Sequence, residues 1–235
     1  EEKRLNEIAS NSMYSFGVNE YMIKYSGQLF LRNMSEGSVL EMGPAEGVMT
    51  DILVKRFADY TVVDGAKVFV DSIKKRHPNV QGEVSCFEDF KPERKFKNII
   101  LGHVLEHVEN PVQILKKCKL LLEEGGKIVA SVPNCNSVHR QAAVKMGLLN
   151  HVNDLNEADL HHGHRRVYSF QEFINDFESA GLTIQKSGGY WLKPMSNKQI
   201  EGTWTSDMIW AFMELGEQYP EIAAEIYVVA GRGNE

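Results

Sequence analysis

The stretch Val39–Gly47, with the sequence VLEMGPAEG, decides the fold of this chain. It reads as a short buried strand that ends in a glycine turn and opens into a helix. Apolar residues recur at helical spacing behind it, at Met49, Ile52, Leu53 and Phe57. A strand, a glycine turn and a helix N-terminus are the parts of a nucleotide-binding crevice in an open α/β sheet. The free N–H groups and partial positive charge of the helix N-terminus suit an anionic group.

The glycine spacing discriminates between cofactors. A dinucleotide site requires G-x-G-x-x-G, whereas this turn has E-x-G-x-x-x-G, formed by Glu41, Gly43 and Gly47. A carboxylate two residues before the turn suits a cofactor that carries a cation at that point, and it would repel a pyrophosphate. The motif is short, so an ordinary strand–helix connection remains the alternative for this stretch taken alone.

A second strand is expected at Tyr60–Val63, and Asp64-Gly65 closes it. Asp64 lies about twenty residues after the glycine turn, where a doubly wound fold places an acid against ribose hydroxyls. The alternative for an aspartate before glycine is a plain turn residue. The order of glycine turn and strand-end acid favours ribose binding.

These residues, together with Leu105-Glu106-His107-Val108, resemble the class I (Rossmann-like) S-adenosylmethionine-dependent methyltransferases. The similarity is greatest to the branch of the ubiquinone-biosynthesis O-methyltransferases, and it runs from about Val39 to Asn134. The resemblance implies that S-adenosylmethionine is the cofactor. It also implies which residues contact it at the first two strands: Glu41, Gly43, Gly47, Asp64 and Gly65. The chain departs from the family at Pro44, a position where proline costs a helix start little.

The remaining pattern alternates strands and helices, which predicts parallel strands with right-handed crossovers. We expect an α/β fold, a three-layer αβα sandwich around a seven-stranded, mostly parallel sheet. The resemblance implies an antiparallel pair of strands at the C-terminus. The expected organisation is a single domain over residues 1–235, with an N-terminal helical lid at 1–33 and an acceptor-side insertion at about 136–168.

Two further parts of the cofactor site follow from the resemblance. The end of the third strand, Cys86-Phe87, lies where the family contacts adenine, although the family's usual acid is absent at Cys86. The end of the fourth strand, Gly102-His103, lies where donor and acceptor meet. Tyr14, in the N-terminal segment, is a candidate lid residue, with aromatic packing on the sheet as its alternative.

Histidines are the candidate catalytic residues, because imidazole titrates near neutral pH and can act as a general base. The candidates are His103, His107 and His164. In the family, the Glu-His pair after strand four is partly structural, and the same reading stays open for His107.

The segment His151–Arg166 is rich in histidine and arginine. This segment could form a metal site, a cationic substrate pocket or a solvated loop. The pocket is favoured because arginine offers bidentate donors to carboxylate or phosphate. H-H-G-H is not a helix-face pair, so we predict no metal. The substrate-binding candidates are His161, His162, Arg165, Arg166 and Tyr168.

The composition limits the partners. A net charge of −6 argues against nucleic acid, since phosphate binding needs a basic face. The sequence contains no run of about twenty apolar residues, so no membrane span is predicted. Three widely spaced cysteines fit a reducing cytoplasm. The sequence leaves a homodimer open.

The predicted reaction is transfer of a methyl group to an oxygen, less readily a nitrogen, of a small polar acceptor that is anionic or linked to a sugar or phosphoryl group. Modification of a polysaccharide or natural product fits this class. The alternatives are an NAD-linked oxidoreductase, which the missing G-x-G-x-x-G disfavours, and a non-catalytic S-adenosylmethionine-binding protein, which the intact motifs disfavour.

Overall fold

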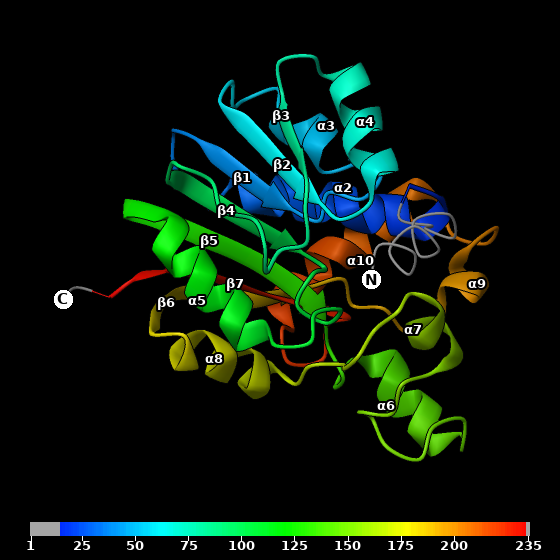
Figure 1. The fold of residues 1–235 in the computed structure, drawn as a ribbon. Helices are drawn as coiled ribbons and strands as arrows, with labels where there is room; N and C mark the ends of the chain where they lie inside the picture. The colour runs from blue at the N-terminus through cyan, green and yellow to red at the C-terminus, as the bar shows by residue number, and fades with distance from the viewer. Residues whose placement is uncertain (1–14, 234–235) are drawn as a thin grey trace.

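A seven-stranded sheet runs through the centre of the molecule in the order β3-β2-β1-β4-β5-β7-β6 (Figure 1). The computed structural model describes residues 15–233. The strands are β1 Val39–Met42, β2 Tyr60–Asp64, β3 Gln81–Val84, β4 Phe96–Gly102, β5 Leu122–Pro133, β6 Leu182–Tyr190 and β7 Glu225–Arg232.

The first five strands are parallel, and β7 lies antiparallel between β5 and β6. All four residues of β1 and all five of β2 are buried, as expected for parallel strands covered on both faces. The predicted mostly parallel sheet with an antiparallel C-terminal pair is therefore confirmed.

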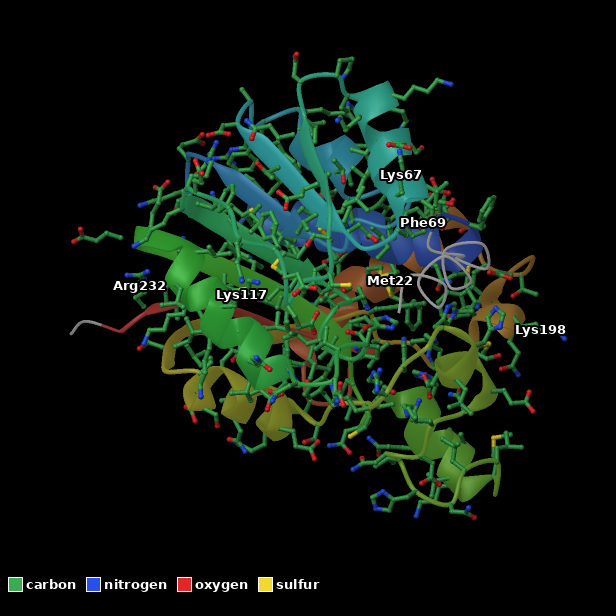
Figure 2. All side chains as sticks on the ribbon, viewed as in Figure 1. Met22, Lys67, Phe69, Lys117, Lys198 and Arg232 are labelled. Atoms are coloured by element: carbon green, nitrogen blue, oxygen red, sulfur yellow. The ribbon has the colours of Figure 1, made fainter. Side chains whose placement is uncertain are left out.

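Helices cover both faces of the sheet and complete the predicted three layers. One apolar core contains residues of α2, α3, α4 and α10, and the other contains residues of α5 and α8. The described helices are α2 Gly17–Leu31, α3 Thr50–Leu53, α4 Lys67–Arg76, α5 Pro111–Leu121, α6 Val138–Lys145, α7 Glu157–His161, α8 Phe170–Ser179, α9 Asn197–Ile200 and α10 Ser206–Gln218. Figure 2 shows Lys67, Lys198 and Arg232 at the rim of the fold and Met22 near its centre.

Local sequence signals fix several helix ends. Ser169 and Glu172 form a capping box at the start of α8, in which each side chain accepts a hydrogen bond from the other residue's backbone N–H. Asn110 caps α5 by accepting from Gln113 N at 3.0 Å, with Pro111 at the first helical position.

Two elements run against their local sequence signals. Strand β6 continues through Gly188-Gly189 to Tyr190, although consecutive glycines weaken a strand. Gly188 leaves room for the Tyr227 ring of the neighbouring strand, because a Cβ at Gly188 would lie 2.7 Å from that ring. The glycine therefore fits within the strand and does not end it. The segment His151–Arg166, for which a solvated loop was one of three interpretations, contains the short helix α7, whose N-terminus is closed by a capping box of Asn156 and Asp159.

The segment 136–168 lies between β5 and α8 and holds α6 and α7, which lie together to one side of the sheet (Figure 1). Arg140 ties this segment together, donating to Val152 O at 2.9 Å and to the Asp159 carboxylate at 2.9 Å. Among residues 15–233, no helix is both long and apolar enough to cross a bilayer.

Candidate functional site

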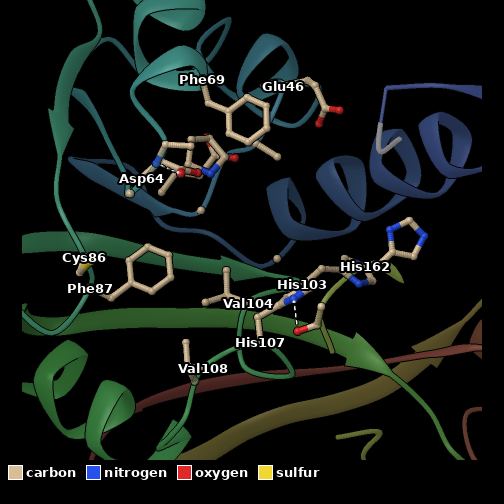
Figure 3. A pocket seen from close by; sticks show the side chains of 18 of the residues that line it. Glu46, Asp64, Phe69, Cys86, Phe87, His103, Val104, His107, Val108 and His162 are labelled. Carbon is tan, nitrogen blue, oxygen red and sulfur yellow. Dashed lines mark hydrogen bonds between the residues drawn. The ribbon is translucent and has the colours of Figure 1, made fainter. Parts of the chain in front are cut away.

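A cavity of about 500 Å³ opens at the carboxyl edge of the parallel strands, where open α/β sheets bind their ligands. Its size is ordinary for a small-molecule site. The turns after β1, β2, β3 and β4 line it from one side, and the segment after α7 lines it from another (Figure 3). The predicted site residues that it brings together are Glu41, Gly43, Asp64, Gly65, Cys86, Phe87, Gly102, His103, His107, His161, His162 and Arg165.

The turn after β1 requires glycine at its first position. Gly43 has φ +70°, and its N–H donates to Val63 O at 2.9 Å. A Cβ there would lie 2.9 Å from Val104 Cγ2 and 3.3 Å from the Phe87 ring. The missing side chain therefore leaves open the part of the cavity between the β1, β3 and β4 turns.

Glu41 is a buried carboxylate at the wall of this cavity. Its Oε2 accepts hydrogen bonds from Thr50 Oγ1 at 2.6 Å and from the Tyr60 hydroxyl at 2.7 Å. Burial raises the pKa of Glu41 to about 7, although the two hydrogen bonds act in the opposite direction. A cation in the cavity would favour the ionised form and so would be attracted to this position.

Asp64 ends β2 at the same wall, and its Oδ1 accepts from Ala66 N at 2.8 Å. Burial raises the pKa of Asp64 to about 6 against the effect of the Ala66 and Ala45 N–H groups. Phe69, from the first turn of α4, also lines the cavity and lies near Asp64 (Figure 3). Phe69 was not predicted from the sequence, although its position in the first turn of the helix after a strand-end acid is a signal for such a residue.

The third-strand end contributes Cys86 and Phe87, as expected, and also Glu88 and Asp89. Cys86 stands where the family usually has an acid, but Glu88 and Asp89 still give this wall of the cavity two carboxyl groups. Gly47 does not line the cavity. With φ +81°, it lies under α4, where a Cβ would be 2.8 Å from Ile73 Cγ1.

His103 lies at the end of β4 with φ +56°. Its Nε2 is 3.3 Å from the Tyr190 hydroxyl, and its Nδ1 is 3.4 Å from Glu106 Oε1 and 3.8 Å from Glu225 Oε2. Burial alone would lower the pKa of His103, but the two carboxylates outweigh burial and raise it. Glu225, the first residue of β7, was not predicted from the sequence.

The opposite end of the cavity carries imidazole and guanidinium groups. His107 Nδ1 lies 3.4 Å from Gly163 O, and burial lowers the pKa of His107 to about 4. Arg165 donates from Nε to His107 O at 3.0 Å, which places its guanidinium at the cavity. His162 lines the same end (Figure 3).

Three other predicted residues lie behind this wall. His164 Nδ1 is 3.4 Å from the Asp159 carboxylate. Arg166 donates to the carbonyls of Leu105, Val108 and Glu109 at 3.0, 2.6 and 3.0 Å. The Tyr168 hydroxyl donates to Asp176 Oδ2 at 2.9 Å. The last predicted residue, Tyr14, lies outside the described residues.

A family model described as a methyltransferase domain matches residues 18–187. The chain belongs to this methyltransferase family. The match decides against the NAD-linked oxidoreductase that the glycine spacing had left as an alternative.

Relatives with curated names agree with this family. A ubiquinone biosynthesis O-methyltransferase of Coxiella burnetii (strain Dugway 5J108-111) is 29% identical over 125 residues, which are 51% of this chain and 52% of that protein. The enzyme of the same name from Actinobacillus pleuropneumoniae serotype 7 (strain AP76) is 25% identical over 171 residues, covering 68% and 71%. The chain thus spans about half the length of the first of these relatives and more of the second.

Solved structures share the fold. The N-methyltransferase NodS from Bradyrhizobium japonicum, in complex with S-adenosylhomocysteine, has a TM-score of 0.55 at 14% identity, with 89% and 86% of the two chains covered. An S-adenosylmethionine-dependent methyltransferase from Mesorhizobium loti has a TM-score of 0.64 at 16% identity, with 88% and 96% covered.

The cofactor of this family is S-adenosylmethionine, and the cavity fits it. The absence of a side chain at Gly43 leaves room for a ligand to approach the backbone closely. Glu41 and Asp64 are buried carboxylates at the cavity wall, groups of the kind that attract a cation or accept hydrogen bonds from hydroxyls. Phe69 and Phe87 are apolar groups of the kind on which a purine packs.

Proposed function

We propose that this methyltransferase moves a methyl group to an oxygen of a small polar acceptor that is anionic or linked to a sugar or phosphoryl group. The observation that carries the proposal is the division of the cavity. Glu41, Glu46, Asp64, Glu88 and Asp89 line the end formed by the β1, β2 and β3 turns, whereas His107, His162 and Arg165 line the other end together with a single acid, Glu109. A cationic cofactor suits the first end and an anionic acceptor the second.

Bound S-adenosylmethionine supplies an already activated methyl group, so the protein's main task is to align the acceptor oxygen. Arg165 is the proposed orienting residue, because its guanidinium is planar and is held by the His107 carbonyl. An anionic oxygen needs no general base. For an acceptor hydroxyl, His103 and His107 are the proposed catalytic residues, since both line the cavity. His164 lies behind the wall, so its proposed role is indirect.

Oxygen is favoured over nitrogen because the curated relatives named above are O-methyltransferases. Ile23 of α2 lines the cavity, which supports the proposed lid function of the N-terminal segment. A cytoplasmic location, a homodimer and no nucleic-acid partner complete the proposal. Sedimentation analysis and a nucleic-acid binding assay test the last two.

The deciding experiment measures S-adenosylhomocysteine release with matched acceptors. Phosphorylated sugars and sugar acids are compared with neutral sugars, phenols and amines. We expect turnover with the anionic oxygen acceptors and a raised acceptor KM in Arg165→Ala. Preferential turnover of amines or neutral phenols would contradict the proposed acceptor class.

A further inference from the structure

Three potential metal ligands from two separate segments converge behind the cavity wall. Glu106 and His107 belong to the turn after β4, and His164 follows α7. One carboxylate oxygen or ring nitrogen from each residue lies within 4.8 Å of the others. The rings of His107 and His164 are nearly perpendicular, with centroids 4.8 Å apart. His107 also lines the cavity, so the cluster lies directly behind its acceptor end.

The carboxylate of Glu106 is fully buried, with 0% of the residue exposed. Within residues 15–233, neither of its oxygens accepts a hydrogen bond. The nearest cation candidate is His103, whose Nδ1 lies 3.4 Å from Glu106 Oε1 and pairs with it when the ring is protonated. A buried carboxylate that accepts no hydrogen bond needs a charged partner or a metal to neutralise it, and a metal can supply this charge in addition to His103.

The two imidazoles each have an oxygen beside Nδ1, as metal-binding histidines usually do. His107 Nδ1 is hydrogen-bonded to the Gly163 carbonyl at 3.4 Å. His164 Nδ1 lies 3.4 Å from the Asp159 carboxylate, within ion-pair distance but without a hydrogen bond. Asp159 is itself held by Arg140 and by the Asn156 N–H, each at 2.9 Å. A carbonyl or carboxylate on one ring nitrogen fixes the tautomer and leaves the lone pair on the other.

We propose that Glu106, His107 and His164 bind a divalent transition metal. Two imidazoles and one carboxylate suit Zn²⁺, Fe²⁺ or Mn²⁺ better than Mg²⁺ or Ca²⁺, which prefer oxygen ligands throughout. The metal fastens the insertion to the turn after β4 and so fixes the acceptor end of the cavity. A metal-bound His107 has no lone pair left to accept a proton, so His103 is then the proposed base for a hydroxyl acceptor. This site goes beyond the proposed methyl transfer and gives a role to His164, which does not line the cavity.

The histidine-rich segment alone predicted no metal, because H-H-G-H lacks the spacing of a local site. The structure supplies the missing ligands from Glu106-His107, far away in the sequence. The competing explanation is an ion-pair network in which imidazolium groups neutralise Glu106. The two explanations differ in whether the protein takes up a stoichiometric metal.

The test uses the full chain, stripped with a chelator and titrated with Co²⁺ while the visible ligand-field bands are followed. Zn²⁺ is the competitor, and Mg²⁺ is the negative control. We expect about one equivalent of Co²⁺, displaced by Zn²⁺ and not by Mg²⁺. Glu106→Gln and His164→Gln should each weaken binding by about 100-fold or more, because each loses a ligand. His151→Gln, at an exposed histidine of the same insertion, should bind like the wild type.

Absence of ligand-field bands in the wild-type titration would overturn the proposal, as would unchanged affinity in His164→Gln. S-adenosylhomocysteine binding, measured by calorimetry, reports whether each variant is folded. Should Glu106→Gln fail to fold, the wild-type titration and His164→Gln still decide. Metal uptake needs no acceptor, so failure of the proposed methyl transfer and failure of this site are separate results.

Discussion

The Tyr60 hydroxyl donates a hydrogen bond of 2.7 Å to Oε2 of Glu41, from one parallel strand to its neighbour. Both residues are buried, and Thr50 Oγ1 donates to the same oxygen at 2.6 Å. These two donors favour the ionised carboxylate, whereas burial disfavours it. The charge of Glu41 near neutral pH therefore depends on side chains that do not themselves line the cavity.

Removing one donor tests this dependence. Tyr60→Phe should raise the pKa of Glu41 above its value of about 7, because burial then acts with less opposition. We expect S-adenosylmethionine affinity at pH 7 to fall by about three- to tenfold, the effect of one hydrogen bond of about 1 kcal/mol. Calorimetry at pH 7 and pH 9 checks this, with partial recovery expected at pH 9. Equal loss at both values would point to a packing defect instead.

The affinity for S-adenosylmethionine should itself depend on pH. A cationic ligand favours ionised Glu41, so below a pKa of about 7 binding must release a proton and weakens as pH falls. We expect about a tenfold loss from pH 7.5 to pH 5.5, with little change above pH 8. Glu41→Gln should bind more weakly and lose most of this dependence. An unchanged pH profile in Glu41→Gln would assign the titration to another group, with Asp64, of pKa about 6, as the next candidate.

Asp64 is proposed to hold the ribose. Asp64→Ala should weaken cofactor binding by on the order of 1–3 kcal/mol, because charge-assisted hydrogen bonds are lost. Asp71→Ala is the matched control, since Asp71 is an exposed acid of α4 that pairs with Lys67. Calorimetry with S-adenosylhomocysteine measures both variants. A dissociation constant that stays unchanged in Asp64→Ala would refute the assignment.

The features that the sequence predicted well are local along the chain. The glycine turn directly follows the buried strand β1, and Asp64 ends the buried strand β2. In both cases the strand that the sequence predicts also fixes the position of the site residue. The alternation of strands and helices along the chain predicted the parallel sheet.

The features that the sequence did not predict come from contacts between distant segments. Glu225 reaches His103 because β7 lies antiparallel to β5, and neither residue indicates the other. His164 lies near Glu106 because the segment after α7 folds back against the turn after β4. Glycine patterns were ambiguous too: Gly43 opens the cavity, whereas Gly47 makes room for α4.

Gly43→Ala tests the part of the cavity that glycine keeps open. The backbone there has φ +70°, and the new methyl group would approach Val104 Cγ2 to 2.9 Å. We expect at least about a tenfold loss of cofactor affinity, with a stability loss of about 1–2 kcal/mol from the left-handed conformation. Gly202→Ala is the control, since it has φ +78° but no atom within 4 Å of its Cβ position. Equal affinity in the two variants would contradict a close approach of the cofactor at Gly43.

The two adjacent arginines should give different defects, although the sequence placed both in the acceptor pocket. Arg166 donates to three carbonyls of the turn after β4, so Arg166→Ala should lower the stability of the fold by about 2–4 kcal/mol and lower Tm clearly. Arg165 is exposed and lines the cavity, so Arg165→Ala should leave Tm nearly unchanged and raise the acceptor KM. Thermal denaturation and steady-state kinetics separate the two effects, and cofactor affinity should be unchanged in Arg165→Ala. A raised KM in Arg166→Ala with wild-type Tm would show instead that Arg166 turns toward the acceptor.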